Sequence, residues 1–299
     1  MPQYLGETAE SCCAFLDRVA QEVLPAVDDI TDIDAVMEAV DALSEGDKAA
    51  KASVDIALHD LLGKIEGQPL WKMWGIDSSA TPCTSFTIGY DESDEVVLEK
   101  VAEASWAKIL KVKLGMGSEK DKRMINLVRS VTDVPVYVDA NQGWKTKEEA
   151  LEMIEWLAEQ GVVLVEQPMA KELVEEHRWI TEHSPLPIIA DEACQRLEDI
   201  ESLEGAYDGI NIKLMKCTGL NEARKMIAKA RELGMQVMLG CMTETSVGIS
   251  AAAQISPLVD YADLDGNVLL SNDNYKGVGL SDGRLVLNGL PGIGAVPVE

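Results

Sequence analysis

The chain has 299 residues, of which 46% are hydrophobic, so it is long enough to bury a large core. Asp and Glu (52 residues) outnumber Lys and Arg (26), and the net charge of -26 disfavours nucleic acids and anionic membranes as partners. Residues 1–20 lack the basic start of a targeting signal, and no apolar run approaches the ~18 residues of a membrane span, so we expect a cytoplasmic protein.

Residues 1–80 contain three helical patterns and precede any regular series of strand-like runs. The patterns cover residues 15–24, 33–43 and 49–62, and the third ends at Gly67-Gln-Pro69. They do not belong to the repeat that follows. We therefore predict that residues 1–80 form a partial, mostly helical capping domain.

A repeat of short apolar runs, most of them ending in a polar residue, begins near residue 84. Successive steps from Lys113 to Asp139, Glu166, Asp191 and Lys213 are 26, 27, 25 and 22 residues, the length of one strand, one helix and two short loops. The pattern predicts an α/β fold, a (β/α)7β TIM-like barrel over residues 81–266. The runs cover residues 84–89, 109–114, 134–139, 162–166, 186–191, 209–213, 236–240 and 261–265.

Amphipathic helical patterns separate these runs. In the acidic pattern of residues 171–183, we expect His177 and His183 to lie at the solvated surface. The periodicity ends after Asp265. Residues 267–299 are rich in Gly and Asn and predict short strands and turns that return to the cap.

Two lysines, Lys111 and Lys113, lie two residues apart inside an otherwise apolar strand pattern. Side chains alternate along a strand, so both point to the same face, about 6 to 7 Å apart. Buried ammonium groups repel each other, and such a pair requires either opposing anions or one neutral lysine. A lysine with a lowered pKa is suited to act as a general base near pH 7.

Three carboxylates, Asp139, Glu166 and Asp191, end consecutive strands and therefore meet at the rim where barrel active sites lie. An all-oxygen set without His or Cys favours a hard ion such as Mg²⁺ over zinc. The alternative is that each carboxylate only caps the helix after its strand. Helix capping is a good explanation for a single Asp at a strand end. It is a poor explanation for three carboxylates at the ends of three successive strands.

Lys113 on the second strand and Lys213 on the sixth are expected nearly opposite each other across the barrel mouth, with the metal site between them. A substrate carboxylate held by the metal has a more acidic α-hydrogen. One lysine can remove the α-proton from one face, and the other can return a proton to the opposite face. This two-base chemistry inverts a stereocentre.

Five motifs contain these residues, and a sixth begins at the end of the run of residues 236–240. The six are Lys111-Val-Lys113, Val138-Asp-Ala-Asn-Gln-Gly-Trp144, Val165-Glu-Gln-Pro168, Ala190-Asp-Glu192, Asn211-Ile-Lys-Leu-Met-Lys-Cys-Thr-Gly219 and Gly240-Cys-Met-Thr-Glu244. Together they resemble the enolase superfamily and, within it, the muconate-lactonizing subgroup. The resemblance implies that the three carboxylates bind Mg²⁺ and that Lys113 and Lys213 catalyse a 1,1-proton transfer through a metal-stabilised enediolate. It also implies that Lys111 supports the substrate carboxylate.

Asp263 and Asp265 bear on the choice among members of this subgroup. Both carboxylates face the same way at the end of the eighth strand, where two anions suit a free α-ammonium group. The pair is similar to the feature by which dipeptide epimerases hold the N-terminus of their substrate, and Thr87 resembles a further substrate contact. The resemblance therefore implies an epimerase acting on the C-terminal residue of a dipeptide, with L-Ala-D/L-Glu from cell-wall peptides as the family expectation. The alternative for both Asp residues is a solvated loop or helix-cap pair.

Other functions stay open at this point. N-acylamino acid racemases, o-succinylbenzoate synthases and cycloisomerases share the catalytic residues. A Schiff-base lyase would also use a barrel lysine, but it would not need three strand-end carboxylates. The family's cap normally starts with a small antiparallel sheet, which this sequence begins too late to encode, so a catalytically impaired dipeptide-binding protein is a further alternative. Family members often form homo-oligomers, and the resemblance allows one here.

Overall fold

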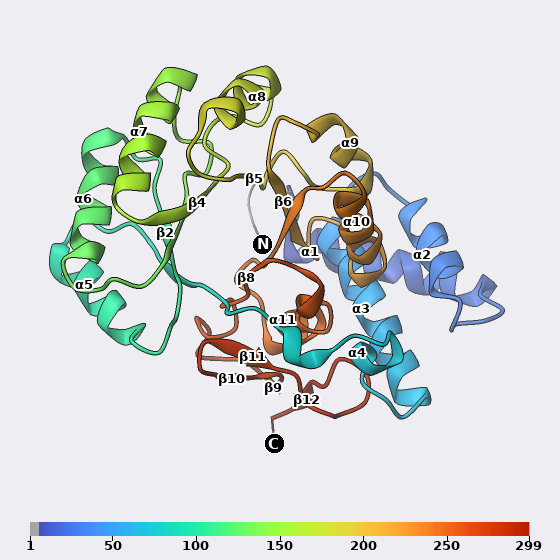
Figure 1. Ribbon diagram of the computed structural model, residues 1–299. Coiled ribbons are helices and arrows are strands. Elements are labelled where there is room, and N and C mark those ends of the chain that lie inside the picture. Colours follow the sequence, from blue (N-terminus) through green and yellow to red (C-terminus); the bar gives the residue numbers. More distant parts are fainter. Residues whose placement is uncertain (1–5, 299) are drawn as a thin grey trace.

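The computed structural model describes residues 6–298. Its centre is a sheet of eight parallel strands, around which the helices lie (Figure 1). Each strand pairs with its neighbours in chain order, from β1 to β8. A bridge between Thr84 and Ala262 brings the start of the β1 segment against β8. The predicted (β/α)7β barrel is therefore confirmed. The strands are β1 (Phe86–Ile88), β2 (Leu110–Lys113), β3 (Val136–Asp139), β4 (Val162–Glu166), β5 (Ile188–Ala190), β6 (Gly209–Lys213), β7 (Gln236–Gly240) and β8 (Tyr261–Asp263).

Helices follow the strands in the predicted alternation. N-cap residues begin two of these helices. The Ser93 hydroxyl accepts a hydrogen bond from Val96 N at the start of α5, and the Thr146 hydroxyl accepts one from Glu149 N at the start of α7. Their apolar faces are buried, as in α10, where residues three and four apart are inaccessible to solvent. The helices are α5 (Asp94–Glu103), α6 (Ser118–Arg129), α7 (Lys147–Glu159), α8 (Val174–His183), η5 (Leu197–Asp199), α9 (Ile200–Leu203), α10 (Leu220–Glu232), α11 (Ser246–Ala253) and η6 (Ser256–Leu258).

The residues before β1 form helices with a small core of their own. This core includes Phe15, Val36, Met37, Val40 and Leu58. In Figure 1 the helices α1 to α3 lie beside α10, and α3 contacts α10 where the cap meets the barrel. The elements are α1 (Ala9–Arg18), η2 (Val19–Val23), η3 (Leu24–Ala26), α2 (Ile33–Asp41), α3 (Lys48–Ile65), α4 (Leu70–Met73) and η4 (Ser78–Ala80).

Asp55 of α3 joins this cap to the barrel. It is fully buried, and its carboxylate accepts hydrogen bonds from Leu220 N and Asn221 N at the start of α10. The Arg224 guanidinium of α10 lies 4.3 Å from the centre of the Trp74 ring. A cap residue therefore satisfies the free N–H groups that begin a barrel helix.

The segment after β8 forms four short strands, β9 to β12. It runs back along the cap (Figure 1). Leu70 N donates to Gly292 O at 3.1 Å, and Ile293 N donates to Asp60 Oδ1 at 3.1 Å. The predicted domain boundaries at residues 80 and 266 fall between these groups of elements and stay a prediction. The strands are β9 (Tyr275–Lys276), β10 (Gly279–Ser281), β11 (Arg284–Val286) and β12 (Val296–Pro297).

One expectation about exposure is wrong. His177 is fully buried in α8 and stacks on Tyr207 with ring centres 4.7 Å apart, although its helix is acidic. Burial lowers the pKa of His177. The prediction relied on the acidic residues next to His177 in the sequence. It was wrong because His177 lies on the buried face of α8, against Tyr207. Across residues 6–298, no helix is both long and apolar enough to cross a membrane.

Candidate active site

Three carboxylates meet at the rim formed by the C-terminal ends of the strands. Asp139 and Glu166 are the last residues of β3 and β4, and Asp191 directly follows β5. Asp139 and Glu166 are in register across the two strands. One oxygen from each carboxylate lies within 4.8 Å of the others, and all three residues are buried. This spacing allows one cation to contact all three.

Glu166 shows why a cation fits this cluster. Its Oε1 accepts a hydrogen bond from Asn211 Nδ2 at 2.8 Å. Its buried Oε2 accepts no hydrogen bond from any residue in the range 6–298, although Lys111 Nζ lies 2.7 Å away. Burial, and then the charge of Asp139, raise the pKa of Glu166 to about 7. A divalent cation between the three carboxylates would add positive charge beside that of Lys111 and lower this pKa, and a donor set of carboxylates alone suits Mg²⁺.

Lys111 of β2 is buried among acidic groups. Its Nζ lies 2.7 Å from Glu166 Oε2, 3.1 Å from Asp139 Oδ2 and 2.7 Å from Asp263 Oδ2. Burial acts to lower the pKa of Lys111, but the charges of Asp263 and Glu166 outweigh it and raise that pKa well above the ordinary value. Lys111 is therefore a fixed cation rather than the neutral lysine that a general base requires.

Lys113 and Lys213 flank the three carboxylates. Lys113 Nζ lies 2.6 Å from Asp139 Oδ2, and Lys213 Nζ lies 2.8 Å from Asp191 Oδ2. Burial opposes ionisation of both carboxylates, but the nearby lysines keep the pKa of Asp139 and that of Asp191 below their ordinary range. β2 and β6 are four strands apart in an eight-stranded barrel, so the two lysines approach the cluster from opposite sides.

Asp263 and Asp265 lie at the end of β8, and both are only 4% exposed, so neither belongs to a solvated loop. Asp263 accepts hydrogen bonds from Lys111 Nζ and from Ser85 Oγ, each at 2.7 Å. Asp265 Oδ2 accepts one from Thr87 N at 2.7 Å, which places Thr87 beside the acidic pair. Burial, and then the charge of Asp263, raise the pKa of Asp265 to about 6.

Several residues at this site were not recognised as functional from the sequence. Lys216 is fully buried, and its Nζ donates to Asp191 Oδ1 at 2.6 Å and to three main-chain carbonyls. The Asn211 amide donates a hydrogen bond to Glu166 Oε1. The Gln167 side chain accepts one from the main-chain N–H of Asp191. All three fall within the motifs that surround the catalytic residues. A polar residue within an apolar segment was the one sequence feature that could have identified them. Their hydrogen-bond partners depend on tertiary contacts and are not visible in the sequence.

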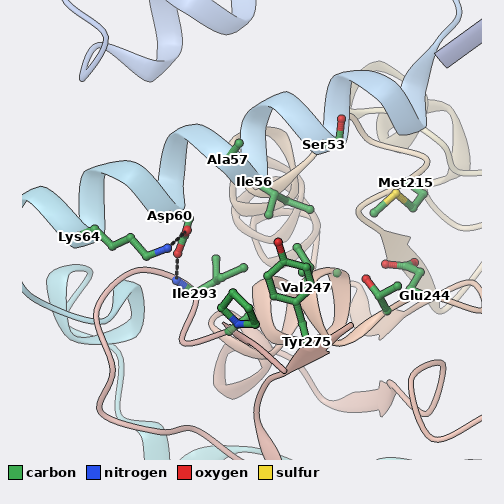
Figure 2. Close-up of a pocket in the computed structure, with 14 residues that line it drawn as sticks. Ser53, Ile56, Ala57, Asp60, Lys64, Met215, Glu244, Val247, Tyr275 and Ile293 are labelled. Carbon is green, nitrogen blue, oxygen red and sulfur yellow. Dashed lines mark hydrogen bonds and ion pairs between the residues drawn. The ribbon is translucent and has the colours of Figure 1, made fainter. Parts of the chain in front are cut away.

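A pocket of about 450 Å³ lies between α3, α11 and the C-terminal segment. Figure 2 shows Met215 and Glu244 at one end and Lys64 at the other, with Tyr275 and Ile293 from the C-terminal segment. Met215 and Glu244 belong to the loops after β6 and β7. The pocket therefore adjoins the rim, but none of the nine predicted site residues lines it.

Two family models match the chain. One, described as enolase C-terminal domain-like, matches residues 95–299. The other, the N-terminal domain of mandelate racemase and muconate lactonizing enzyme, matches residues 5–75. The chain belongs to the enolase superfamily. The resemblance inferred from the six motifs is confirmed, and it extends to the cap as well as to the barrel.

Individual relatives and solved structures are also similar to this chain. An L-Ala-D/L-Glu epimerase from Bacteroides thetaiotaomicron is 55% identical over 298 residues, which are 100% of this chain and 76% of that protein. A dipeptide epimerase from Enterococcus faecalis, solved with Mg and L-Leu-L-Tyr, is 33% identical with a TM-score of 0.89, covering 97% of this chain and 84% of that one. A dipeptide epimerase from Cytophaga hutchinsonii, solved with Mg and D-Ala-L-Val, is 26% identical with a TM-score of 0.91 over 98% and 82% of the two chains.

Proposed function

We propose that this protein is a Mg²⁺-dependent dipeptide epimerase that inverts the α-carbon of the C-terminal residue. The observation that carries the proposal is the placement of Lys113 and Lys213 on opposite sides of one carboxylate cluster. A single base can exchange an α-proton on one face only, whereas two opposed bases can invert the centre. The three similar epimerases support the same reaction.

In the proposed reaction, one of the two lysines is neutral and removes the α-proton, while the other is an ammonium and donates a proton to the opposite face. The lysines exchange protonation states in each turnover, so the reverse reaction uses the same pair. Mg²⁺ held by Asp139, Glu166 and Asp191 would bind the substrate carboxylate and stabilise the negative charge that develops when the α-proton leaves. Lys111 adds a permanent positive charge beside that position.

The substrate class follows from the acidic pair at β8. Asp263 and Asp265 place two buried carboxylates at the rim, and a free α-ammonium group is the cation that a dipeptide can offer them. Muconates and succinylbenzoate precursors have no such cation. Thr87 would contact the substrate beside Asp265.

L-Ala-D/L-Glu is the substrate we assign, because the relative that is 55% identical over the whole chain bears that name. Such a dipeptide would be released from cell-wall peptides and epimerised in the cytoplasm. The proposal also includes assembly into a homo-oligomer, as expected for this family.

The test compares substrates that differ at the amino group. L-Ala-L-Glu, N-acetyl-L-Ala-L-Glu and N-acetyl-L-Glu are each incubated with protein and Mg²⁺ in D₂O. NMR follows diastereomer formation from the two dipeptides, and racemisation of N-acetyl-L-Glu is followed by loss of its α-hydrogen signal and of its optical rotation. We expect turnover of the free dipeptide and a loss of at least about 100-fold in kcat/KM on acetylation, because the acidic pair then has no cation to bind. Preferred turnover of N-acetyl-L-Glu would instead indicate an N-acylamino acid racemase.

A further inference from the structure

Gln167, the residue after Glu166, has an uncommon main-chain conformation. Its φ is +37°, in the left-handed region that residues other than Gly, Asn and Asp seldom adopt. Its N–H donates to Ile189 O at 2.9 Å, and its carbonyl accepts a hydrogen bond from Gln142 N at 2.9 Å. The loops after β3 and β4 are thereby tied to β5. Strain of this kind persists where the surrounding contacts fix it, often at functional sites.

The Gln167 side chain is fully buried, and its amide makes four hydrogen bonds. Oε1 accepts from Asp191 N at 2.9 Å and from Ala193 N at 3.1 Å. Nε2 donates to Met169 O at 3.1 Å and to Tyr207 Oη at 3.0 Å. Both lone pairs and both N–H groups of the amide are used, so the side chain has one defined position.

These bonds matter because the sheet itself does not hold Asp191. The pairing of β4 with β5 ends at Glu166 and Ile189, and the pairing of β5 with β6 ends at Ala190. Asp191 therefore lies beyond the last paired residue of its strand on both sides. Gln167 holds its main-chain N–H, while Lys216 holds its carbonyl and Oδ1.

We propose that Gln167 is a positioning residue that sets the separation between Glu166 and Asp191 and thereby the Mg²⁺ affinity of the site. The inference rests on the proposed assignment of both carboxylates as metal ligands. Glu166 is covalently adjacent to Gln167, and Asp191 is bound to its amide, so one side chain fixes two ligands from different strands. Outer residues that orient metal ligands typically contribute about 10- to 100-fold to metal affinity.

The test replaces the amide with an apolar side chain of similar length, as Gln167→Met, and measures Mg²⁺ binding by titration calorimetry without dipeptide. Gln254→Met is the matched control. Gln254 is also fully buried, accepts a hydrogen bond from Trp71 N at 3.1 Å and donates to Ile293 O at 3.0 Å. It lies directly after α11, outside the metal cluster. Thermal unfolding of each variant is recorded with and without Mg²⁺.

We expect Gln167→Met to raise the Kd for Mg²⁺ at least about tenfold and to reduce the increase in Tm caused by Mg²⁺. Gln254→Met should lower Tm in the apo form but leave the Kd within about twofold of wild type. Gln167→Asn provides a second variant if Gln167→Met does not fold, because the shortened amide cannot span the same distance and should weaken Mg²⁺ binding in the same way.

The activity assay adds a second readout. In Gln167 variants, the Mg²⁺ concentration for half-maximal rate should rise, while kcat at saturating Mg²⁺ should fall less. An unchanged Kd in a folded Gln167 variant would overturn the positioning role and leave the proposed function intact. A wild-type protein that binds no Mg²⁺ would overturn the metal assignment and this inference together.

Discussion

Lys111 Nζ lies 2.7 Å from Asp263 Oδ2, which joins the second strand of the barrel to the eighth. From the sequence, these two residues had separate roles, with Lys111 at the substrate carboxylate and Asp263 at the substrate ammonium. In the structure each also balances the charge of the other. Burial acts to raise the pKa of Asp263, but Lys111 outweighs it and lowers that pKa, so both groups are ionised.

Asp263→Asn should therefore impair catalysis by two routes. It removes a carboxylate proposed to bind the dipeptide ammonium, and it leaves Lys111 with one fewer anion. Loss of one partner from a buried charge pair typically costs about 2–5 kcal/mol, so we expect kcat/KM for L-Ala-L-Glu to fall at least about 30-fold. Asp282→Asn is the control, because Asp282 pairs with Lys108 at the exposed surface and should leave kcat/KM unchanged. Equal activity of Asp263→Asn and wild type would remove Asp263 from the proposed site.

Lys113→Gln and Lys213→Gln should separate the two halves of the reaction. Each substitution removes the base on one face, so epimer formation should fall at least about 1,000-fold in both variants. Exchange of the α-hydrogen with D₂O should persist for one epimer in the first variant and for the other epimer in the second. The measurement is NMR of each epimer separately. Exchange of the same epimer by both variants would contradict the assignment of the lysines to opposite faces.

The stability of the protein should depend on Asp265 between pH ~4 and ~6. The folded-state pKa of Asp265, about 6, lies above the value of about 3.9 expected for an unfolded Asp. The folded chain therefore binds this proton more tightly than the unfolded chain does. The stabilising contribution is complete below pH ~4 and is lost as the pH rises through ~6.

Asp265→Asn should remove this part of the pH dependence. We expect its free energy of unfolding to exceed that of wild type most clearly above pH ~6, by up to about 2–3 kcal/mol, and to approach it below pH ~4. Urea unfolding at several pH values provides the measurement, with Asp282→Asn as the control. Parallel stability curves for Asp265→Asn and wild type would show that the carboxyl has an ordinary pKa in the folded protein.

Asp55 tests the joint between cap and barrel. Asp55→Ala leaves one buried and one partly buried N–H group at the start of α10 without their acceptor, which should cost about 2–3 kcal/mol of unfolding free energy. Asp32→Ala removes an exposed cap that accepts one hydrogen bond, from Ala35 N, and should cost about 1 kcal/mol. Denaturant unfolding of both variants compares them directly. If Asp55→Ala costs no more than Asp32→Ala, the cap does not depend on this contact.

The fold was predictable because one local rule repeats along the chain. Apolar runs of strand length alternate with amphipathic helices, so the pattern alone predicts the strand ends and, with them, the positions of Asp139, Glu166 and Lys213. Charge patterns alone were a poorer guide. His177 follows two glutamates but faces the barrel, where burial against Tyr207 decides its environment.

Tertiary contacts explain what the sequence could not reveal. No sequence motif identifies the hydrogen-bond partners of Gln167 and Lys216. Both side chains bind Asp191, which lies 24 residues from Gln167 and 25 residues from Lys216 in the chain. The raised pKa of Lys111 likewise depends on Asp263, 152 residues away in the chain. Residue types identified the chemistry, but the network that orients those residues is visible only in three dimensions.

The most direct test of the account is proton NMR of L-Ala-L-Glu in D₂O with the protein and Mg²⁺. We predict that the α-hydrogen signal of the Glu residue is lost while the L-Ala-D-Glu diastereomer appears, and that EDTA stops both changes until Mg²⁺ is restored in excess. Absence of exchange and of the diastereomer, with folded protein that binds Mg²⁺, would contradict the proposed two-lysine epimerisation of this dipeptide.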